Sequence, residues 1–482
     1  MHVIISLDEA DARQWLLPLS EALAGAGHAI SFRLRPSSRG RDHGIDTLLR
    51  LEARLFGLDC KLMAPLPADT LPVASPDAAP GVILDISGDP SVGDLTLFLD
   101  GAPGIQSASA SLVSGHIPFV EFRDKAGKTI ASGLPAIESP DVVTRAIGQF
   151  FCRLTTLVLM ALDGKARDPV RPPQTDRTPV PQSPYAFFAR SVVNKIANRL
   201  FSARRRRDHW RIGIRPVRGA LDLDRDTLIE GFTWLPDDGA RYYADPILWN
   251  EEGRDFLFLE EFPYATHRGI ISYTELDTGG RPLFVPRPII ERTTHLSYPL
   301  IFRHAGALYM MPENSAENHV PLYRAKRFPD EWEEVAPLLA GHGLHDATLV
   351  EHGGLWWLFG NDAREGGSSW DCLTLFSGST PLGPFTPHPA NPVLVDARVS
   401  RPGGPMLRIG NRLIRPVQSC LGGYGRFTRF IEVEALSMET YRQRECGRML
   451  APLGGQISGI HTYCRNERFE AIDALTPRIF RG

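Results

Sequence analysis

His345-Asp-Ala-Thr-Leu-Val350, followed by Leu355-Trp-Trp-Leu-Phe-Gly-Asn361, decides the fold, because this pair of short strands recurs through the second half of the chain. Copies of the first strand lie at residues 242–248, 296–302, 400–407 and 458–463, and copies of the second at 256–261, 308–313, 413–418 and 468–472. Repeats built from short strands at a period of roughly fifty residues are typical of propeller blades, which bury their faces only against one another. Five copies predict a five-bladed β-propeller.

Polar residues recur at equivalent positions of these apolar strands. They are Asp245, Tyr298, Asp346, Arg401 and His461 on the first strands, and Glu261, Glu313, Asn361 and Gln418 at the ends of the second strands. Burying a carboxylate costs free energy unless the group is paired or used. A ring of them along one axial funnel therefore predicts a ligand site, although each acidic residue alone could cap a turn between blades.

Composition and charge narrow the class of protein. The chain has 482 residues, 23% of them charged, with a formal net charge of -3, which argues against general affinity for nucleic acid. Six cysteines form no CxxC pair or zinc spacing, so we expect reduced thiols in a cytoplasmic protein. The apolar stretch 151–162 contains Arg153 and is too short to cross a bilayer, so we expect a packed helix.

The first 165 residues alternate strand and helix signals. Strands are predicted at 3–6, 29–33, 81–86, 95–99 and 119–122, and helices at 12–26, 44–55 and 140–162. Such alternation is typical of an open, mostly parallel α/β sheet. No GxGxxG motif follows the first strand and no GxxxxGK[ST] occurs, so neither a dinucleotide nor an NTP site is indicated.

Residues 166–208 are predicted to link this α/β domain, residues 1–165, to a propeller at 209–482. Six prolines between 165 and 184 favour extended chain. The segment 185–207 then has apolar residues at near-helical spacing and ends in Arg204-Arg-Arg-Arg207. A basic amphipathic helix of this kind could lie on the inner face of an anionic membrane, or it could pack between domains with its arginines in water.

Several short motifs of the second half resemble one family. They are Glu260-Glu261 with Tyr264, His295-Leu-Ser-Tyr-Pro299, Met311-Pro-Glu-Asn-Ser315, Gly367-Ser-Ser-Trp370 and Ser400-Arg-Pro-Gly-Gly404. In this order they resemble the N-terminal region of plant glucosamine inositolphosphorylceramide transferases and related bacterial proteins, some of which carry a formyltransferase-like domain in front. The resemblance implies that residues 1–165 form a formyltransferase-like domain without activity, since no His-Pro-Ser-Leu-Leu-Pro-like segment occurs. It also adds His295 and Trp370 to the expected substrate-binding residues.

A more distant resemblance is to five-bladed glycoside hydrolases of the arabinanase and invertase type. In those enzymes three carboxylates on separate blades act as base, acid and pKa-tuning group, because glycosidic cleavage needs proton donation to the leaving oxygen. Asp245 matches the base position, and Glu313 and Asp346 are the other catalytic candidates. Glu313 lies on a second strand, so the hydrolase triad is not reproduced intact.

A glycosyltransferase would use the same carboxylates differently. One of them would deprotonate the acceptor, while Arg401, Arg415 and His461 would hold the phosphate of a sugar nucleotide. Both arginines could equally pair with Asp346 or Glu313 as a structural network. No cofactor is required, although the carboxylates and His461 could hold calcium or another divalent ion.

Three functions therefore remain open from sequence. The first is a glycosyltransferase for a bacterial envelope glycan or glycolipid, the second a furanosidase-like glycoside hydrolase, and the third a non-catalytic glycan-binding propeller. We expect no separate transferase domain after the propeller, which favours activity in the propeller itself. The expected partner is a sugar nucleotide or glycan.

Overall fold

A computed structural model describes residues 1–36, 43–67, 70–72, 81–173, 183–201, 208–221, 223, 225–236, 238–363, 366–451 and 455–477. The chain divides into two compact units, Met1–Ala203 with Glu365–Ser368, and Arg204–Arg364 with Ser369–Gly482. Much of the predicted linker, at 174–182 and 202–207, lies outside the described residues. The arginine run of the predicted basic segment lies there too.

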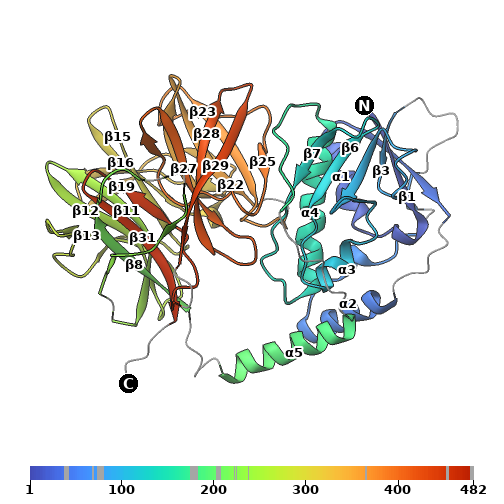
Figure 1. Cartoon of the computed structure of the whole chain (residues 1–482), viewed down its shortest axis with the longest axis horizontal. Coiled ribbons are helices and arrows are strands. Elements are labelled where there is room, and N and C mark those ends of the chain that lie inside the picture. Colours follow the sequence, from blue (N-terminus) through green and yellow to red (C-terminus); the bar gives the residue numbers. More distant parts are fainter. Residues whose placement is uncertain are drawn as a thin grey trace. The chain divides into compact units, whose positions relative to one another are not determined.

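The first unit is an α/β sheet with helices packed on it (Figure 1). Its strands are β1 (His2–Asp8), β2 (Ala29–Arg35), β3 (Val82–Asp85), β4 (Leu95–Leu99), β5 (Ala102–Pro103), β6 (Val120–Asp124) and β7 (Thr129–Gly133). The order is β2-β1-β3-β4-β6-β7, with β5 beside β4. The pairs from β2 to β4 are parallel, and β6 and β7 add antiparallel strands. The predicted sheet rich in parallel strands is confirmed, and helices connect β1 to β2 and β2 to β3.

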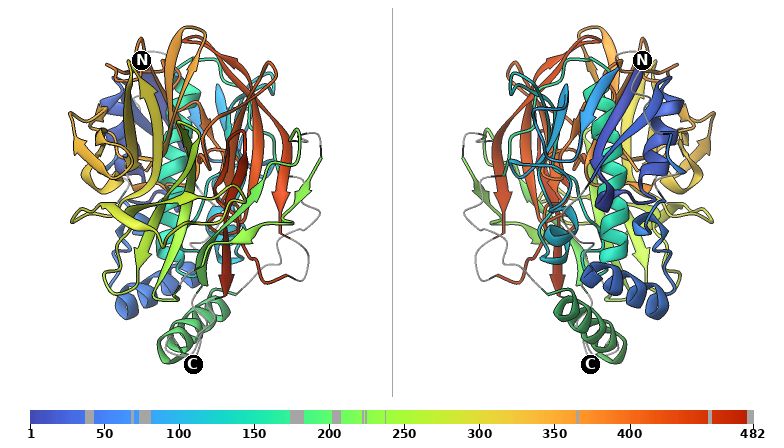
Figure 2. Two further views of the ribbon diagram at one scale, coloured as in Figure 1. Left: turned by 90° about the vertical axis from the view of Figure 1, so that its left-hand side faces the viewer. Right: turned by 90° about the vertical axis from the view of Figure 1, so that its right-hand side faces the viewer.

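The described residues of this unit form five helices: α1 (Leu16–Gly25), α2 (His43–Phe56), α3 (Ala108–Val113), α4 (Val143–Leu162) and α5 (Pro184–Phe201), with short 3-10 turns at Glu9–Asp11 and Lys61–Met63. Helix α4 contacts β6, β7 and the first three helices. By length and composition α4 could cross a membrane, but 67% of its most apolar window is buried. It therefore has the burial of a core helix, as expected from sequence. Figure 2 shows α4 running alongside strands of the first unit.

The second unit is a five-bladed β-propeller, as predicted. Its blades are β11-β12-β13-β14, β15-β16-β18-β19, β21-β22-β23-β24 with β25, β26-β27-β28-β29-β9, and β10-β8-β31-β30. The bounds of the first two blades are Arg241–Glu251, Arg254–Pro263, Ile270–Leu276, Arg287–Ile290, Ser297–His304, Ala307–Glu313, Tyr323–Arg327 and Glu331–Glu334. Those of the third are Leu344–His352, Leu355–Asp362, Cys372–Gly378, Thr386–Pro387 and Leu394–Val395. Those of the fourth are Leu407–Ile409, Arg412–Ser419, Phe427–Leu436, Tyr441–Leu450 and Thr227–Leu228, and those of the fifth Thr233–Trp234, Asp208–Pro216, Phe469–Pro477 and Tyr463–Arg465.

Two strand pairs close the propeller by joining distant parts of the chain. Strand β8 pairs antiparallel with β31, so the fifth blade contains both the first and the last strand of the unit. Strand β9 adds in parallel to the outer strand β29 of the fourth blade. A small ribbon of β17 (His319–Val320) and β20 (Leu339–Ala340) and a 3-10 turn at Ser315–Glu317 complete the described elements.

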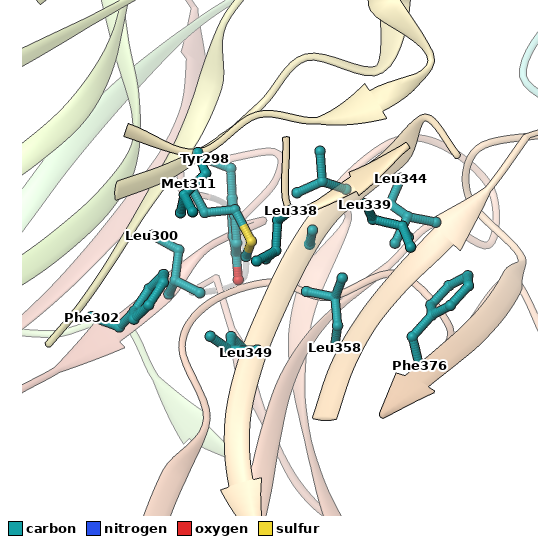
Figure 3. Close-up of a cluster of buried hydrophobic side chains, with 13 residues drawn as sticks. Tyr298, Leu300, Phe302, Met311, Leu338, Leu339, Leu344, Leu349, Leu358 and Phe376 are labelled. Carbon is teal, nitrogen blue, oxygen red and sulfur yellow. The ribbon is translucent and has the colours of Figure 1, made fainter. Parts of the chain in front are cut away.

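Apolar side chains fill the spaces between neighbouring blades. Tyr298, Leu300 and Met311 of the second blade pack against Leu349 and Leu358 of the third (Figure 3). Packing of this kind removes both faces of each blade from water and fixes the inner strands next to one another. Inner strand β11 accordingly contacts β15 on one side and β31 on the other.

Candidate functional site

Three inner strands carry a β-bulge at the same register. The pairing shifts between Ala244 and Ile247 in β11, between Ser297 and Leu300 in β15, and between His345 and Thr348 in β21. The bulged residues Asp245, Tyr298 and Asp346 have φ values of 51°, 47° and 49°. This left-handed conformation is uncommon for residues other than glycine and unusual for a bulky side chain. Its repetition in three blades indicates that the fold maintains a strained geometry at this point.

The backbone N–H of each bulged residue donates a hydrogen bond to a buried carboxylate of the preceding blade. Asp245 donates to Asp473 Oδ2 at 3.0 Å, and Tyr298 to Asp245 Oδ2 at 3.1 Å. Asp346 donates to Glu313 Oε2 at 2.8 Å. These carboxylates thus join successive blades, which is one structural reason for burying them.

His461 lies between two of these carboxylates. Its Nε2 is 3.1 Å from Asp245 Oδ1 and its Nδ1 is 2.9 Å from Asp473 Oδ1. Although burial alone would lower the pKa of His461, the charges of Asp473 and Asp245 raise it well above its usual value. The two carboxylates therefore favour the charged imidazolium form of the histidine that lies between them.

Arg401 supplies a second buried positive charge. Its Nε donates to Asp346 Oδ2 at 2.6 Å, its Nη1 donates to Ser369 Oγ at 2.9 Å, and its Nη2 is 3.7 Å from Glu313 Oε2. Gln418 Nε2 also donates to Asp346 Oδ2, at 2.6 Å. The pairing of Arg401 with Asp346, which sequence left open as one of two alternatives, is the arrangement in the structure.

Seven residues from all five blades form what we call the inner cluster. They are Asp245, Glu260, Glu313, Asp346, Arg401, His461 and Asp473, and all are buried. Five of them were predicted site residues, while Glu260 and Asp473 were not among them. Asp473 lies one residue beyond the last predicted partner strand, so its strand could have been extended to find it.

The carboxyl groups of the inner cluster have pKa values displaced in opposite directions. Burial favours protonation of Asp245, but the His461 charge and the hydrogen bonds from His461 and Thr462 lower its pKa. For Glu313, burial is likewise overcome by His345 and Arg401, so its pKa is well below the usual value.

Burial and the neighbouring Asp245 charge raise the pKa of Glu260 well above the usual value. Burial also raises the pKa of Asp346 despite the Arg401 guanidinium, with Glu313 adding to the rise. One cluster thus contains carboxyl groups whose pKa values are displaced in opposite directions, which is the arrangement that paired base and acid chemistry uses.

Glu260 and Glu261 face opposite sides of β12, as neighbours on a strand do. Glu260 Oε1 accepts a hydrogen bond of 3.2 Å from the Tyr242 hydroxyl and is 3.4 Å from His295 Nε2. Glu261 instead pairs with Arg241 and accepts a bond of 2.7 Å from Ser272 Oγ. The structure therefore places Glu260 in the inner cluster and the predicted Glu261 outside it.

Half-buried aromatic rings surround parts of the inner cluster. The Trp210 and Tyr424 rings lie 4.1 Å and 5.3 Å from the His461 ring, and Trp370 lies 5.8 Å from Tyr424. Near Glu260, the Tyr242 ring stacks on Phe262 at 4.7 Å. Aromatic rings with polar tips beside charged groups suit a ligand that has both apolar faces and hydroxyls.

Other predicted site residues take supporting positions. Tyr298 is buried in the core between the second and third blades, where its hydroxyl contacts Thr348 and accepts from the N–H of Gly404 (Figure 3). Its ring is thus not available to stack on a ligand. The Asn361 side-chain amide donates to the Ser369 carbonyl at 3.0 Å, which holds the loop that also contacts Arg401.

Arg415 also lies outside the inner cluster. It is buried over Phe359 and donates to the carbonyls of Val399 and Ser400 and to Gln443. The alternation of side chains along β27 accounts for this, because Arg415 and Gln418, three residues apart, face opposite sides of the strand. Gln418 accordingly reaches Asp346 and Arg415 does not.

The sequence predicts that carboxylates and His461 around the propeller axis could hold a divalent ion. Donor atoms of Asp245, His461 and Asp473 lie within 4.8 Å of one another. Each nitrogen of His461 faces a different carboxylate. The positive charge of the imidazolium therefore compensates the negative charges of Asp245 and Asp473 without a metal ion. This geometry fits a buried ion-pair triad.

The fold and the inner cluster together define a five-bladed propeller with a charged centre. Residues 237–452 match the family model described as "Glucosamine inositolphosphorylceramide transferase 1, N-terminal". The chain is 35% identical over 208 residues to the transferase of that name from rice (Oryza sativa subsp. japonica), and 33% identical over 216 residues to that from Arabidopsis thaliana. These alignments cover 42% and 43% of this chain but only 28% and 27% of the plant proteins. The expected resemblance is therefore confirmed for the propeller region.

Solved structures to which the chain is similar include glycoside hydrolases. A family 117 enzyme of the marine bacterium Zobellia galactanivorans is 13% identical, with a TM-score of 0.35, over 56% of this chain and 91% of its own. The catalytic domain of a GH62 α-L-arabinofuranosidase of Coprinopsis cinerea is 13% identical, with a TM-score of 0.37, over 55% of this chain and 98% of its own. Because these sequence identities and TM-scores are low, the functional assignment rests on the residues of the inner cluster.

Proposed function

We propose that the propeller is a carbohydrate-active enzyme that transfers a sugar to a hydroxyl acceptor, with Asp245 and Glu260 as the reacting pair. The observation that carries this proposal is that the paired strands β11 and β12 place two buried carboxyl groups in the inner cluster, Asp245 with a lowered pKa and Glu260 with a raised pKa. Both residues lie inside the stretch that matches the transferase family model. The name of the plant relatives makes a glycolipid the acceptor class, and an envelope glycolipid is the bacterial counterpart we propose.

In the proposed reaction Asp245 accepts one proton and Glu260 donates one. As the acceptor oxygen bonds to the anomeric carbon, its proton passes to the carboxylate of Asp245. As the bond to the leaving oxygen breaks, Glu260 donates its proton to that oxygen. Proton exchange with solvent then restores both groups. The aromatic rings of Tyr242 and Phe262 beside Glu260 would bind the apolar face of the sugar.

The contacts of the two arginines argue against their predicted role of holding a donor phosphate. They favour a reaction in which a carboxyl group protonates the leaving oxygen. Arg401 is paired with Asp346, and Arg415 donates to main-chain carbonyls. A sugar nucleotide would have to compete with these contacts, whereas a neutral leaving group needs only the proton of Glu260. This observation supports glycoside hydrolysis, with water as the acceptor, as the second candidate function.

The proposal is tested on the purified full chain with Glu260→Gln and its neighbour Glu261→Gln as a matched pair. Each variant is incubated with a panel of sugar nucleotides and of aryl glycosides, with and without lipid acceptors, and the released nucleotide or phenol is measured. Glu260→Gln should lower turnover by about 10²–10⁴-fold, the usual contribution of a general acid. Glu261→Gln should retain turnover, because Glu261 lies outside the inner cluster.

Thermal shift on the same panel separates binding from catalysis, since a ligand of the native state raises the melting temperature. Turnover of sugar nucleotides only with an acceptor supports transfer, and turnover of glycosides in water supports hydrolysis. Saturable glycan binding without turnover in the unmodified chain would refute catalysis in favour of a binding propeller. Equal losses in both glutamate variants would refute the assignment of Glu260.

A further inference from the structure

Helix α5 has two different faces. Phe187 and Ser191, four residues apart, are buried, and the Ser191 hydroxyl donates to the Asp141 carbonyl at 2.7 Å. The Lys195 ammonium lies 3.3 Å from the centre of the Phe56 ring of α2. Helices α2 and α5 lie side by side within the first unit (Figures 1 and 2). These contacts hold α5 along one side.

The opposite side of α5 is apolar and exposed. Tyr185, Val193 and Ile196 are 60%, 62% and 53% exposed, and Ala189 between them is exposed as well. Their spacing of four, four and three residues puts all four on one helical face. Exposed apolar residues that stand alone need no explanation, but a stripe of four on one helix marks an interaction surface.

The charge around this stripe identifies the partner. Residues 184–201 contain Arg190, Lys195 and Arg199 and no acidic residue, and the sequence continues with Arg204-Arg-Arg-Arg207, outside the described residues. A second copy of the same helix would bring like charges together, which opposes self-association. An anionic lipid surface, by contrast, attracts each cation and accepts the apolar side chains.

We propose that α5 lies on an anionic lipid surface, with Tyr185, Val193 and Ile196 inserted at the boundary between head groups and acyl chains. The buried side of the helix, anchored on α2, keeps this face turned outward. The interaction is peripheral, and it needs both the apolar stripe and the positive charges. It is independent of the reaction proposed for the propeller.

The test is flotation of the full chain with vesicles of phosphatidylcholine alone and of phosphatidylcholine mixed with phosphatidylglycerol. We expect binding only to the mixed vesicles, and weakening of that binding as salt is added. Val193→Ser/Ile196→Ser should lower the partition coefficient by at least about tenfold, because two inserted side chains are lost. Arg190→Gln should lower it by about fivefold.

The matched control is Leu283→Ser/Val285→Ser. These propeller residues are 58% and 72% exposed, so the control removes as much exposed apolar surface without touching α5. It should bind vesicles like the unmodified chain. Circular dichroism and melting temperature establish that each variant is folded, and Arg190→Gln tests the proposal even if the double variant is not.

Three results would overturn the proposal. One is absence of binding to the mixed vesicles, and another is equal binding to both kinds of vesicle. The third is a dimer, detected by analytical ultracentrifugation, that Val193→Ser/Ile196→Ser dissociates while vesicle binding stays unchanged. That last result would assign the stripe to a second copy of the chain.

Discussion

Both units bury carboxylates, but they satisfy them differently. In the α/β unit, Glu52 accepts hydrogen bonds from the N–H groups of Val143 and Thr144 at the start of α4. Asp85 accepts from the N–H groups of Ser87, Gly88 and Asp89 in the loop after β3. In the propeller, buried carboxylates such as Asp473 also accept backbone N–H groups, but those of the inner cluster share two buried cations as well, His461 and Arg401.

Buried carboxylates therefore have two different roles in this protein. A carboxylate that accepts hydrogen bonds at a helix start or in a turn stabilises that element, as Glu52 and Asp85 do. A group of carboxylates that share cations has pKa values displaced in both directions, which is the pattern of functional sites. Burial alone therefore did not distinguish the two units, whereas clustering does.

The largest predicted effect is on stability, from removing a cation of the inner cluster. Arg401→Met should lower the free energy of unfolding by about 3–5 kcal/mol, because it leaves Asp346 and Glu313 buried without the guanidinium between them. Urea unfolding followed by tryptophan fluorescence measures the change.

Two further variants decide whether burial causes that loss. Arg254→Met removes an arginine from the exposed pair with Glu275, and it should cost less than about 1 kcal/mol. Arg401→Met/Asp346→Leu should recover part of the stability, because the unpaired carboxylate is gone as well. A loss in Arg254→Met as large as in Arg401→Met would contradict the contrast between buried and exposed pairs.

The second prediction concerns pH. The pKa of folded His461 is above its unfolded value, so the folded state binds the extra proton and gains stability from it. That stability is fully present below about pH 6.5 and is lost as pH rises through the folded pKa, at up to about 1.4 kcal/mol per pH unit. His461→Gln should remove this slope in urea titrations above neutral pH.

His295 provides the control of opposite sign. Burial lowers its pKa, so the unfolded state binds the proton more tightly. Its contribution is present above about pH 6.5 and is lost as pH falls, and His295→Gln should flatten the acid side of the curve. The same slope change in both variants would mean that a general change in charge, and not the two environments, sets the pH dependence.

The third prediction separates a packed side chain from a ligand-binding one. Tyr298→Phe leaves the buried N–H of Gly404 without its acceptor, so it should cost about 1–3 kcal/mol of stability. Affinity for any glycan identified by thermal shift should not change, because the ring lies in the core. Tyr309→Phe, whose ring stacks on Phe302, is the control and should cost less than about 0.5 kcal/mol. A loss of affinity in Tyr298→Phe would restore the role in binding predicted from sequence.

The propeller could be predicted because its information is local and repeated. Each blade contributes an apolar strand pair with a polar residue at a fixed place, and the predicted equivalence of Asp245, Tyr298 and Asp346 corresponds to the three bulges. Closure by β8 and β9 could not be predicted, because the partners lie more than two hundred residues apart and neither strand repeats the pattern.

The site could be predicted in part for a similar reason. The sequence indicates which strands are polar, but not which of two adjacent residues faces the axis, so Glu261 was selected where Glu260 belongs to the inner cluster. Asp245, Tyr298 and Asp346 lie at equivalent bulges, yet the Tyr298 side chain packs between two blades while the other two belong to the inner cluster. The repeat in the sequence does not distinguish these two outcomes. The formyltransferase-like character of the first unit stays a prediction.

The smallest effect is predicted for the carboxylate of the α/β unit. Glu52→Gln replaces one acceptor of the α4 N–H groups by an amide donor, so it should lower stability by about 1 kcal/mol, the usual loss for a helix cap. The exposed Glu21→Gln on α1 is the control and should have no measurable effect. Neither variant should change turnover or glycan affinity, because the Glu52 carboxylate binds the N–H groups at the start of α4 within the α/β unit. A loss of turnover in Glu52→Gln with the fold intact would show that the α/β unit takes part in the reaction, and the division between structural and clustered carboxylates would then fail.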